Sequence, residues 1–241
     1  KCSAERRSEI DNQVRTYKLG LAFEALVSWG MEHGLGWDIL GRNLQVFVDR
    51  RTIGALDLIT RDRAGEVTHW ELAYKLYLQC DAGIGWGSWL GPLGKDRLSV
   101  KLSHMLEHQL PLSKRPEAKD RLKALGIRTI DHYRILMQGT LCSPWGQDPV
   151  RAEQGEVPAE GRWFRASKLP EVLAECPNSR WALRSKPLWF GPAPPGLDLL
   201  SAEEMLDLPP VEESLLFSRI DEGRDQLVFI VPDAWGHETA R

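Results

Sequence analysis

Two apolar segments, each with an acidic residue where a buried strand is normally entirely apolar, constrain the fold of this chain most strongly. Residues 54–60 read Gly-Ala-Leu-Asp-Leu-Ile-Thr, and residues 68–79 read Thr-His-Trp-Glu-Leu-Ala-Tyr-Lys-Leu-Tyr-Leu-Gln. Successive side chains of a strand point to opposite faces, so Glu71 and Lys75 share one face of the second segment and the other face forms core. The polar residues 62–65 connect the segments, which predicts an antiparallel hairpin.

The acids of this predicted hairpin, Asp57 and Glu71, indicate a metal site. A buried carboxylate is unfavourable unless it is paired with a cation or binds a metal. Carboxylate oxygens from two neighbouring strands suit Mg²⁺ or Mn²⁺, which complete their ligands with water and substrate phosphates. We expect Lys75, on the same face, to orient the attacking water or offset charge on the phosphate. A structural ion pair between Glu71 and Lys75, or a strand face in solvent, explains the same residues without catalysis.

The segments around the hairpin predict the element order αβββαβ. Apolar residues at helical spacing predict a helix at about 12–31, with Glu24 beside its apolar stripe. A strand at 43–48 precedes the two acid-bearing strands, and a second helix at about 96–109 is followed by a strand at 133–141. We therefore expect an α/β (α+β) fold in which helices flank a central mixed sheet.

Several separated blocks of the sequence resemble a known protein family. The blocks are residues 19–26, 54–58, 69–78, 91–92, 96–98, 101–102 and 108–113, with a weaker one at 227–235. In this order they resemble the DUF1853 family of bacterial proteins, which is placed in the PD-(D/E)XK nuclease superfamily. The resemblance covers about residues 17–145. It implies a restriction-endonuclease-like core over residues 1–145 and a C-terminal extension or small subdomain over residues 146–241.

The resemblance also implies roles for individual residues. Asp57 and Glu71 hold the metal, Glu24 on the first helix assists, and a lysine positions water. The superfamily pattern puts this lysine two residues after the acid, where this chain has Ala73. Lys75 stands on the same face but roughly 6–7 Å further along the strand. This displacement motivates an alternative, a catalytically inactive nuclease-like fold that binds nucleic acid or protein.

The predicted second helix carries a basic stripe, because Arg97, Lys101, His104 and His108 recur at helical spacing. We expect this stripe to bind the phosphate backbone of the substrate, although a solvated helix face gives the same pattern. The same helix contains His104-x-x-Glu107-His108, which matches the inverted zinc-peptidase signature. A zinc site needs a third ligand, for which the sequence offers Glu153, Glu156, Glu160, Glu171 and Glu175 without singling one out. A zinc metallopeptidase is therefore a remote alternative.

The segment after residue 145 contains fewer candidate functional residues. Its pattern predicts a helix near 166–175 and a hairpin that pairs residues 215–220 with residues 226–231. We expect the tryptophans in this segment to pack in its interior.

Composition and charge limit these hypotheses. The chain has 241 residues, of which 42% are hydrophobic and 27% are charged, as expected for a globular protein. Its net charge of −3 provides no general attraction to nucleic acid, so binding has to depend on a local basic patch. Scattered cysteines and the absence of a long apolar segment favour a cytoplasmic protein outside the membrane. We predict a Mg²⁺- or Mn²⁺-dependent nuclease that acts on DNA or RNA.

Overall fold

The computed structural model describes residues 18–80, 85–147, 161–191 and 193–236. These residues form two compact units. Unit 1 contains residues 18–74 and 101–138, and unit 2 contains the described residues of 75–100 and those from 139 onward. The units are interleaved along the chain, and the expected boundary at residue 145 stays a prediction.

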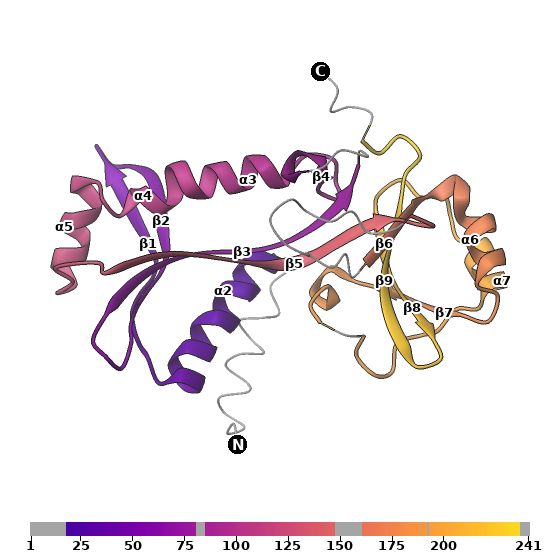
Figure 1. The fold of residues 1–241 in the computed structure, drawn as a ribbon, viewed down its shortest axis with the longest axis horizontal. Helices are drawn as coiled ribbons and strands as arrows, with labels where there is room; N and C mark the ends of the chain where they lie inside the picture. The colour runs from indigo at the N-terminus through magenta and orange to yellow at the C-terminus, as the bar shows by residue number, and fades with distance from the viewer. Residues whose placement is uncertain (1–17, 81–84, 148–160, 192, 237–241) are drawn as a thin grey trace. The chain divides into compact units, whose positions relative to one another are not determined.

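The strands of the described residues are shown as arrows in Figure 1. They are β1 Asp38–Val48, β2 Arg51–Arg61, β3 Val67–Gln79, β4 Trp89–Leu90, β5 His132–Pro144, β6 Gly161–Arg165, β7 Arg180–Arg184, β8 Leu215–Asp221 and β9 Arg224–Val231. They form one nine-stranded sheet in the order β1-β2-β3-β5-β6-β9-β8-β7, and β4 pairs with β3. β5 with β6 and β6 with β9 are parallel, whereas β1–β2, β2–β3, β7–β8 and β8–β9 are antiparallel. The predicted α/β class with a mixed sheet is confirmed, and the restriction-endonuclease-like fold stays a prediction.

The α-helices of the described residues are α2 Leu19–Trp29, α3 Leu98–His104, α4 Leu110–Leu112, α5 Pro116–Ala124, α6 Leu169–Glu175 and α7 Ala202–Leu206. π-helical turns at Gly30–Leu35 and Met105–Gln109 extend α2 and join α3 to α4. The second predicted helix therefore begins two residues later than expected and continues past Gln109. Residues 12–17 of the first predicted helix lie outside the described residues, and Lys18, just before α2, is extended. None of the described helices is both long and apolar enough to cross a membrane.

Strands β1, β2 and β3 form the antiparallel part of unit 1. Asp49 and Arg50 join β1 to β2 with φ angles of 47° and 65°, the left-handed conformation typical of two-residue hairpin loops. In the next turn the Asp62 carboxylate accepts hydrogen bonds of 2.9 Å from the backbone N–H groups of Ala64 and Glu66. The hairpin predicted from the two acid-bearing segments is confirmed.

In unit 1, α2 and α4 lie on opposite faces of the sheet (Figure 1). The core on the α4–α5 side contains Val46, Leu56, Ile59, Val67, Leu112, Ala118, Leu122 and Ile127. Because helices cover both faces, β3 is buried on both, and the expectation that only one of its faces is core was wrong. Glu71, on the face expected to be open, is 0% exposed.

In unit 2, strands β6 to β9 pack against α6 and α7. Their core contains Phe164, Val172, Leu173, Cys176, Trp181, Met205, Phe217, Val228 and Ile230. The predicted C-terminal hairpin is confirmed, since β8 and β9 pair from Leu215 opposite Ile230 to Asp221 opposite Arg224. Trp181 and Trp189 are buried, as expected for packing residues.

Candidate functional site

The two acids of the β2–β3 hairpin lie where the strands separate. The β2–β3 ladder ends with Leu58 opposite Trp70, and continuing its register by one residue sets Asp57 opposite Glu71. At this point the Asp57 carboxylate accepts a 2.9 Å hydrogen bond from the backbone N–H of Leu72. The Asp57 side chain thus lies between β2 and β3 and takes the place of a backbone acceptor. The Asp57 and Glu71 carboxyl groups are also within hydrogen-bonding reach of one another. The structure therefore brings the two predicted metal ligands together.

Glu71 is held from one side by a buried histidine. Its Oε1 lies 2.8 Å from Nε2 of His69, and both side chains are 0% exposed. Burial lowers the pKa of His69 to about 4, so the ring is neutral at pH 7. When Glu71 is ionised its oxygens only accept, so Nε2–H of His69 then donates to Oε1. On the other edge of the ring, Nδ1 lies 3.0 Å from the Ser113 hydroxyl, which also donates to the Leu110 carbonyl oxygen at 3.4 Å.

From the other side Glu71 is held by Gln109, which ends the π turn before α4. The Gln109 amide nitrogen donates to Oε2 of Glu71 at 2.8 Å. Its oxygen accepts a hydrogen bond of 2.9 Å from Lys101 and lies 3.1 Å from Nδ1 of His104. Lys101 and His104 are therefore connected to the buried acid through one amide.

The third acid of the site, Glu24, comes from α2. A cavity of about 450 Å³ is lined by Glu24 and Asp57 and also by Glu32 and Arg42. Arg42 donates to Glu32 at 2.7 Å, so this pair is neutralised. Glu71 does not line the cavity. A ligand that enters this cavity therefore meets Glu24 and Asp57 first, with Glu71 behind them.

The carboxyl groups of Glu24, Asp57 and Glu71 lie close together with too few cations nearby to neutralise them. Burial raises the pKa of Glu24 to about 7, and the neighbouring charge of Asp57 adds to this effect. Burial and the charge of Glu71 raise the pKa of Asp57 to about 6. The pKa of Glu71 is raised by burial to about 7, although hydrogen bonds from Asp57 oppose the shift. The charge of Lys101 lowers all three pKa values, but they stay above those of ordinary carboxyl groups. A proton or a divalent cation would relieve this excess of negative charge.

Carboxylate oxygens are the ligands that hard divalent cations take, so Asp57, Glu71 and Glu24 are the residues that could hold such an ion. Within the described residues, no group of three or more His, Cys, Asp or Glu side chains is arranged to hold a metal ion. Mg²⁺ nevertheless needs only one or two carboxylates when substrate phosphates and water complete its ligands. Asp57 and Glu71 meet this requirement, and Glu24 adds a further carboxylate beside Asp57.

Lys75 is paired elsewhere. Its ammonium lies 2.5 Å from Oδ2 of Asp96, and the hydroxyl of Tyr77 donates to the same oxygen at 3.3 Å. These three residues belong to unit 2, because β3 passes from unit 1 to unit 2 after Tyr74. The expected charge partner of Glu71 is thus bound to another acid, and Lys101 is the lysine whose charge acts on the carboxylates of unit 1.

The residues of the predicted basic stripe have different partners, and its role in binding phosphate stays a prediction. Arg97 donates to the carbonyl oxygen of Gly87 at 2.8 Å, whereas Lys101 and His104 converge on Gln109. The ring of His108 lies beside that of His104, with centroids 5.4 Å apart. Only Lys101 and His104 are therefore connected to the acidic site.

The remote zinc alternative gains no third ligand in the described residues. Of the five candidate glutamates, Glu171 pairs with Lys168 and Glu175 accepts from the Trp145 indole. The other three lie outside the described residues.

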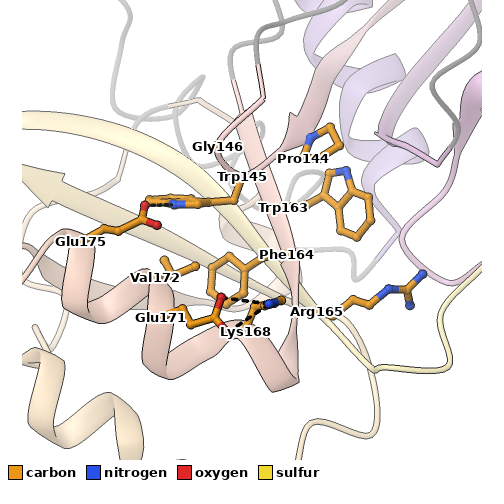
Figure 2. A pocket seen from close by; sticks show the side chains of 10 residues that line it. All are labelled: Pro144, Trp145, Gly146, Trp163, Phe164, Arg165, Lys168, Glu171, Val172 and Glu175. Carbon is orange, nitrogen blue, oxygen red and sulfur yellow. Dashed lines mark hydrogen bonds and ion pairs between the residues drawn. The ribbon is translucent and has the colours of Figure 1, made fainter.

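A further cavity, of about 300 Å³, lies in unit 2 and is shown in Figure 2. Trp145, Trp163 and Phe164 form its aromatic walls, and the acids in its lining, Glu171 and Glu175, are the paired ones just described. It contains none of the residues predicted for the nuclease site.

Sequence reasoning assigned no role to three residues that complete the site: His69, Gln109 and Ser113. His69 stands two residues before Glu71, so strand alternation alone puts both side chains on one face. Gln109 and Ser113 are four residues apart on a helical segment and therefore also share a face. Their contact with β3 depends on how α4 packs, which no local pattern indicates.

Comparison with known families extends the resemblance found in the sequence. The chain matches the family described as "Domain of unknown function (DUF1853)" over residues 4–241. No curated protein and no solved structure matches it. The family match includes both units and covers nearly the whole chain, so this protein belongs to the DUF1853 family.

Proposed function

We propose that this DUF1853 protein is a Mg²⁺- or Mn²⁺-dependent nuclease with a PD-(D/E)XK-like site. The observation that carries the proposal is the meeting of Asp57 and Glu71 at the open end of the β2–β3 ladder. Glu24 lies beside them at the cavity, and their raised pKa values favour the arrival of positive charge. The substrate is DNA or RNA, whose phosphates supply the missing oxygen ligands.

Hydrolysis of a phosphodiester adds water across one P–O bond. The water oxygen bonds to phosphorus, and the leaving ester oxygen departs with a proton. A divalent cation, when bound by Asp57 and Glu71 with help from Glu24, supplies charge neutralisation for the phosphate and a lower pKa for the attacking water. Lys101 offsets the negative charge that develops on the phosphate.

The hydrogen bonds around Glu71 give it one orientation. His69 and Gln109 each bond a different oxygen of this carboxyl group, and Asp57 bonds it as well, so the group is fixed from several sides. Such supporting contacts typically matter 10–100-fold for metal affinity or activity. We therefore assign His69 and Gln109 as positioning residues.

The test is cleavage of labelled single- and double-stranded DNA and RNA with Mg²⁺ or Mn²⁺, against EDTA. We expect metal-dependent cleavage by the wild type, and a loss of at least about 10²-fold in Asp57→Asn and Glu71→Gln. Lys186→Ala, an exposed lysine of unit 2, is the folded control. Cleavage that persists in both acid variants would come from a contaminant and refute the proposal.

Two further variants decide which lysine serves the site. We expect Lys101→Met to lose cleavage and Lys75→Ala to keep most of it, because Lys75 is bound to Asp96. The reverse result would return the auxiliary role to Lys75.

A second candidate is a nuclease-like fold that binds nucleic acid without cutting it. The observation that favours it is Ala73 at the usual lysine position. Binding by the wild type with no cleavage under Mg²⁺, Mn²⁺ or another divalent ion would select this alternative.

A further inference from the structure

Unit 1 contains a second, larger cavity beside α5. Its volume is about 870 Å³, and we call it the α5 cavity. Its charged lining residues are Lys119, Lys123 and Arg128, with a single acid, Asp120. Positive charge therefore dominates this cavity in a chain whose net charge is −3.

The three cationic side chains of the α5 cavity form no ion pairs with carboxylates of the described residues. Lys119, Lys123 and Arg128 are exposed, and none of their side chains has an ion-pair or hydrogen-bond partner among the residues that the structure describes. Nearby Arg115, in contrast, is paired with Glu117 at 3.2 Å. The imbalance extends along the chain, since residues 113–134 contain seven Lys and Arg but three Asp and Glu. A solvated helix face would explain exposed cations on α5 alone. Here Arg128, from the loop after α5, lines the same cavity as Lys119 and Lys123.

The α5 cavity also connects to the acidic site. Ser113 lines it and is 3% exposed. The Ser113 hydroxyl lies 3.0 Å from Nδ1 of His69, and Nε2 of His69 lies 2.8 Å from Glu71. The wall of the cavity is thus two hydrogen bonds from the buried carboxylate, within the same unit.

We infer that the α5 cavity binds phosphate groups of the nucleic-acid strand, an assignment that rests on the proposed nuclease function. Lys119, Lys123 and Arg128 neutralise backbone phosphates, a contact that contributes affinity without reading sequence. The basic patch that an acidic chain needs for nucleic-acid binding is then supplied by α5 and the loop after it, and not by the stripe expected on α3.

The test is binding of a labelled oligonucleotide to the full chain in EDTA, where no cleavage occurs, over a series of salt concentrations. The slope of log K against log [salt] is negative for nucleic-acid binding. Each of Lys123→Ala and Arg128→Ala should make this slope shallower by about 1. Arg121→Ala is the matched control, because Arg121 is an exposed cation of α5 that does not line the cavity. It should leave the slope unchanged.

Two results would overturn the inference. One is equal salt dependence in the cavity variants and Arg121→Ala. The other is a wild-type chain that binds inorganic phosphate but no oligonucleotide, which would make the cavity a small-anion site. Cleavage assays separate this inference from the proposed function. A wild type that cleaves while both cavity variants bind normally refutes the cavity alone, whereas binding through the cavity without any cleavage refutes the nuclease alone.

Discussion

The buried carboxylate of Glu71 should make the metal-free protein less stable as pH rises, and Glu71→Gln should remove part of this dependence. The folded-state pKa of Glu71 is raised from 4.5 to about 7 by burial. The folded state consequently binds more protons than the unfolded state between these two values. Stability must fall as pH increases through this window, the opposite of the usual behaviour of a salt-bridged acid.

The size of the effect follows from the same values. A rise in pKa from 4.5 to about 7 corresponds to at most about 3 kcal/mol. Coupling to Asp57 divides this energy between two groups, so we expect roughly 1–3 kcal/mol from Glu71. His69 acts in the opposite sense, since its pKa is lowered to about 4 and its stabilising contribution is lost as pH falls below 6.5. Comparing two variants that both retain His69 cancels this contribution.

The assay is urea unfolding in EDTA at pH 5 and pH 8, with wild type and Glu71→Gln measured in parallel. The glutamine places an amide N–H₂ against Gln109 and loses this hydrogen bond at both pH values. The cost of the lost bond therefore cancels when the stability at pH 8 is subtracted from that at pH 5. Between pH 5 and pH 8 the wild type should lose about 1–3 kcal/mol more stability than Glu71→Gln. Equal losses in the two proteins would show that Glu71 is not an ionisable buried acid, and the electrostatic argument for a cation site would fail with it.

Four other substitutions test three separate parts of the structure. Lys75→Ala should cost at most about 1 kcal/mol in urea unfolding, because its ion pair with Asp96 is more than one-third exposed at both ends. Gly139→Ala should cost about 3 kcal/mol or more in the same assay, since a Cβ there would lie 1.5 Å from the carbonyl oxygen of Lys75 at a φ of +148°. Gly65→Ala, with a positive φ but open space, should cost only about 1 kcal/mol, and equal losses for the two glycines would contradict the close approach. Ser113→Ala should cost about 1–2 kcal/mol by leaving a buried ring nitrogen of His69 without its hydrogen-bond partner, and a neutral result by thermal unfolding would contradict this hydrogen bond.

Local pattern predicted the parts of this protein that depend on neighbours in sequence. The period of two in the acid-bearing segments predicted the antiparallel hairpin and set Asp57 and Glu71 on it, because a strand alternates faces whatever surrounds it. The C-terminal hairpin followed from the same rule. Helix ends were less predictable, since the π turn that carries Gln109 has no recognised sequence signal and shifts every later contact of the helix.

The sequence by itself thus determined the acids, their strands and the family. Only the tertiary structure decided what each acid contacts. Lys75 pairs with Asp96, 21 positions away, and Gln109 reaches Glu71 from 38 positions away. Alternation specifies the face of a strand on which a side chain lies, but the charge nearest to that face comes from whichever helix packs there. Lys101 and Gln109 therefore became visible as site residues only after α3, the π turn and α4 had been placed against the sheet.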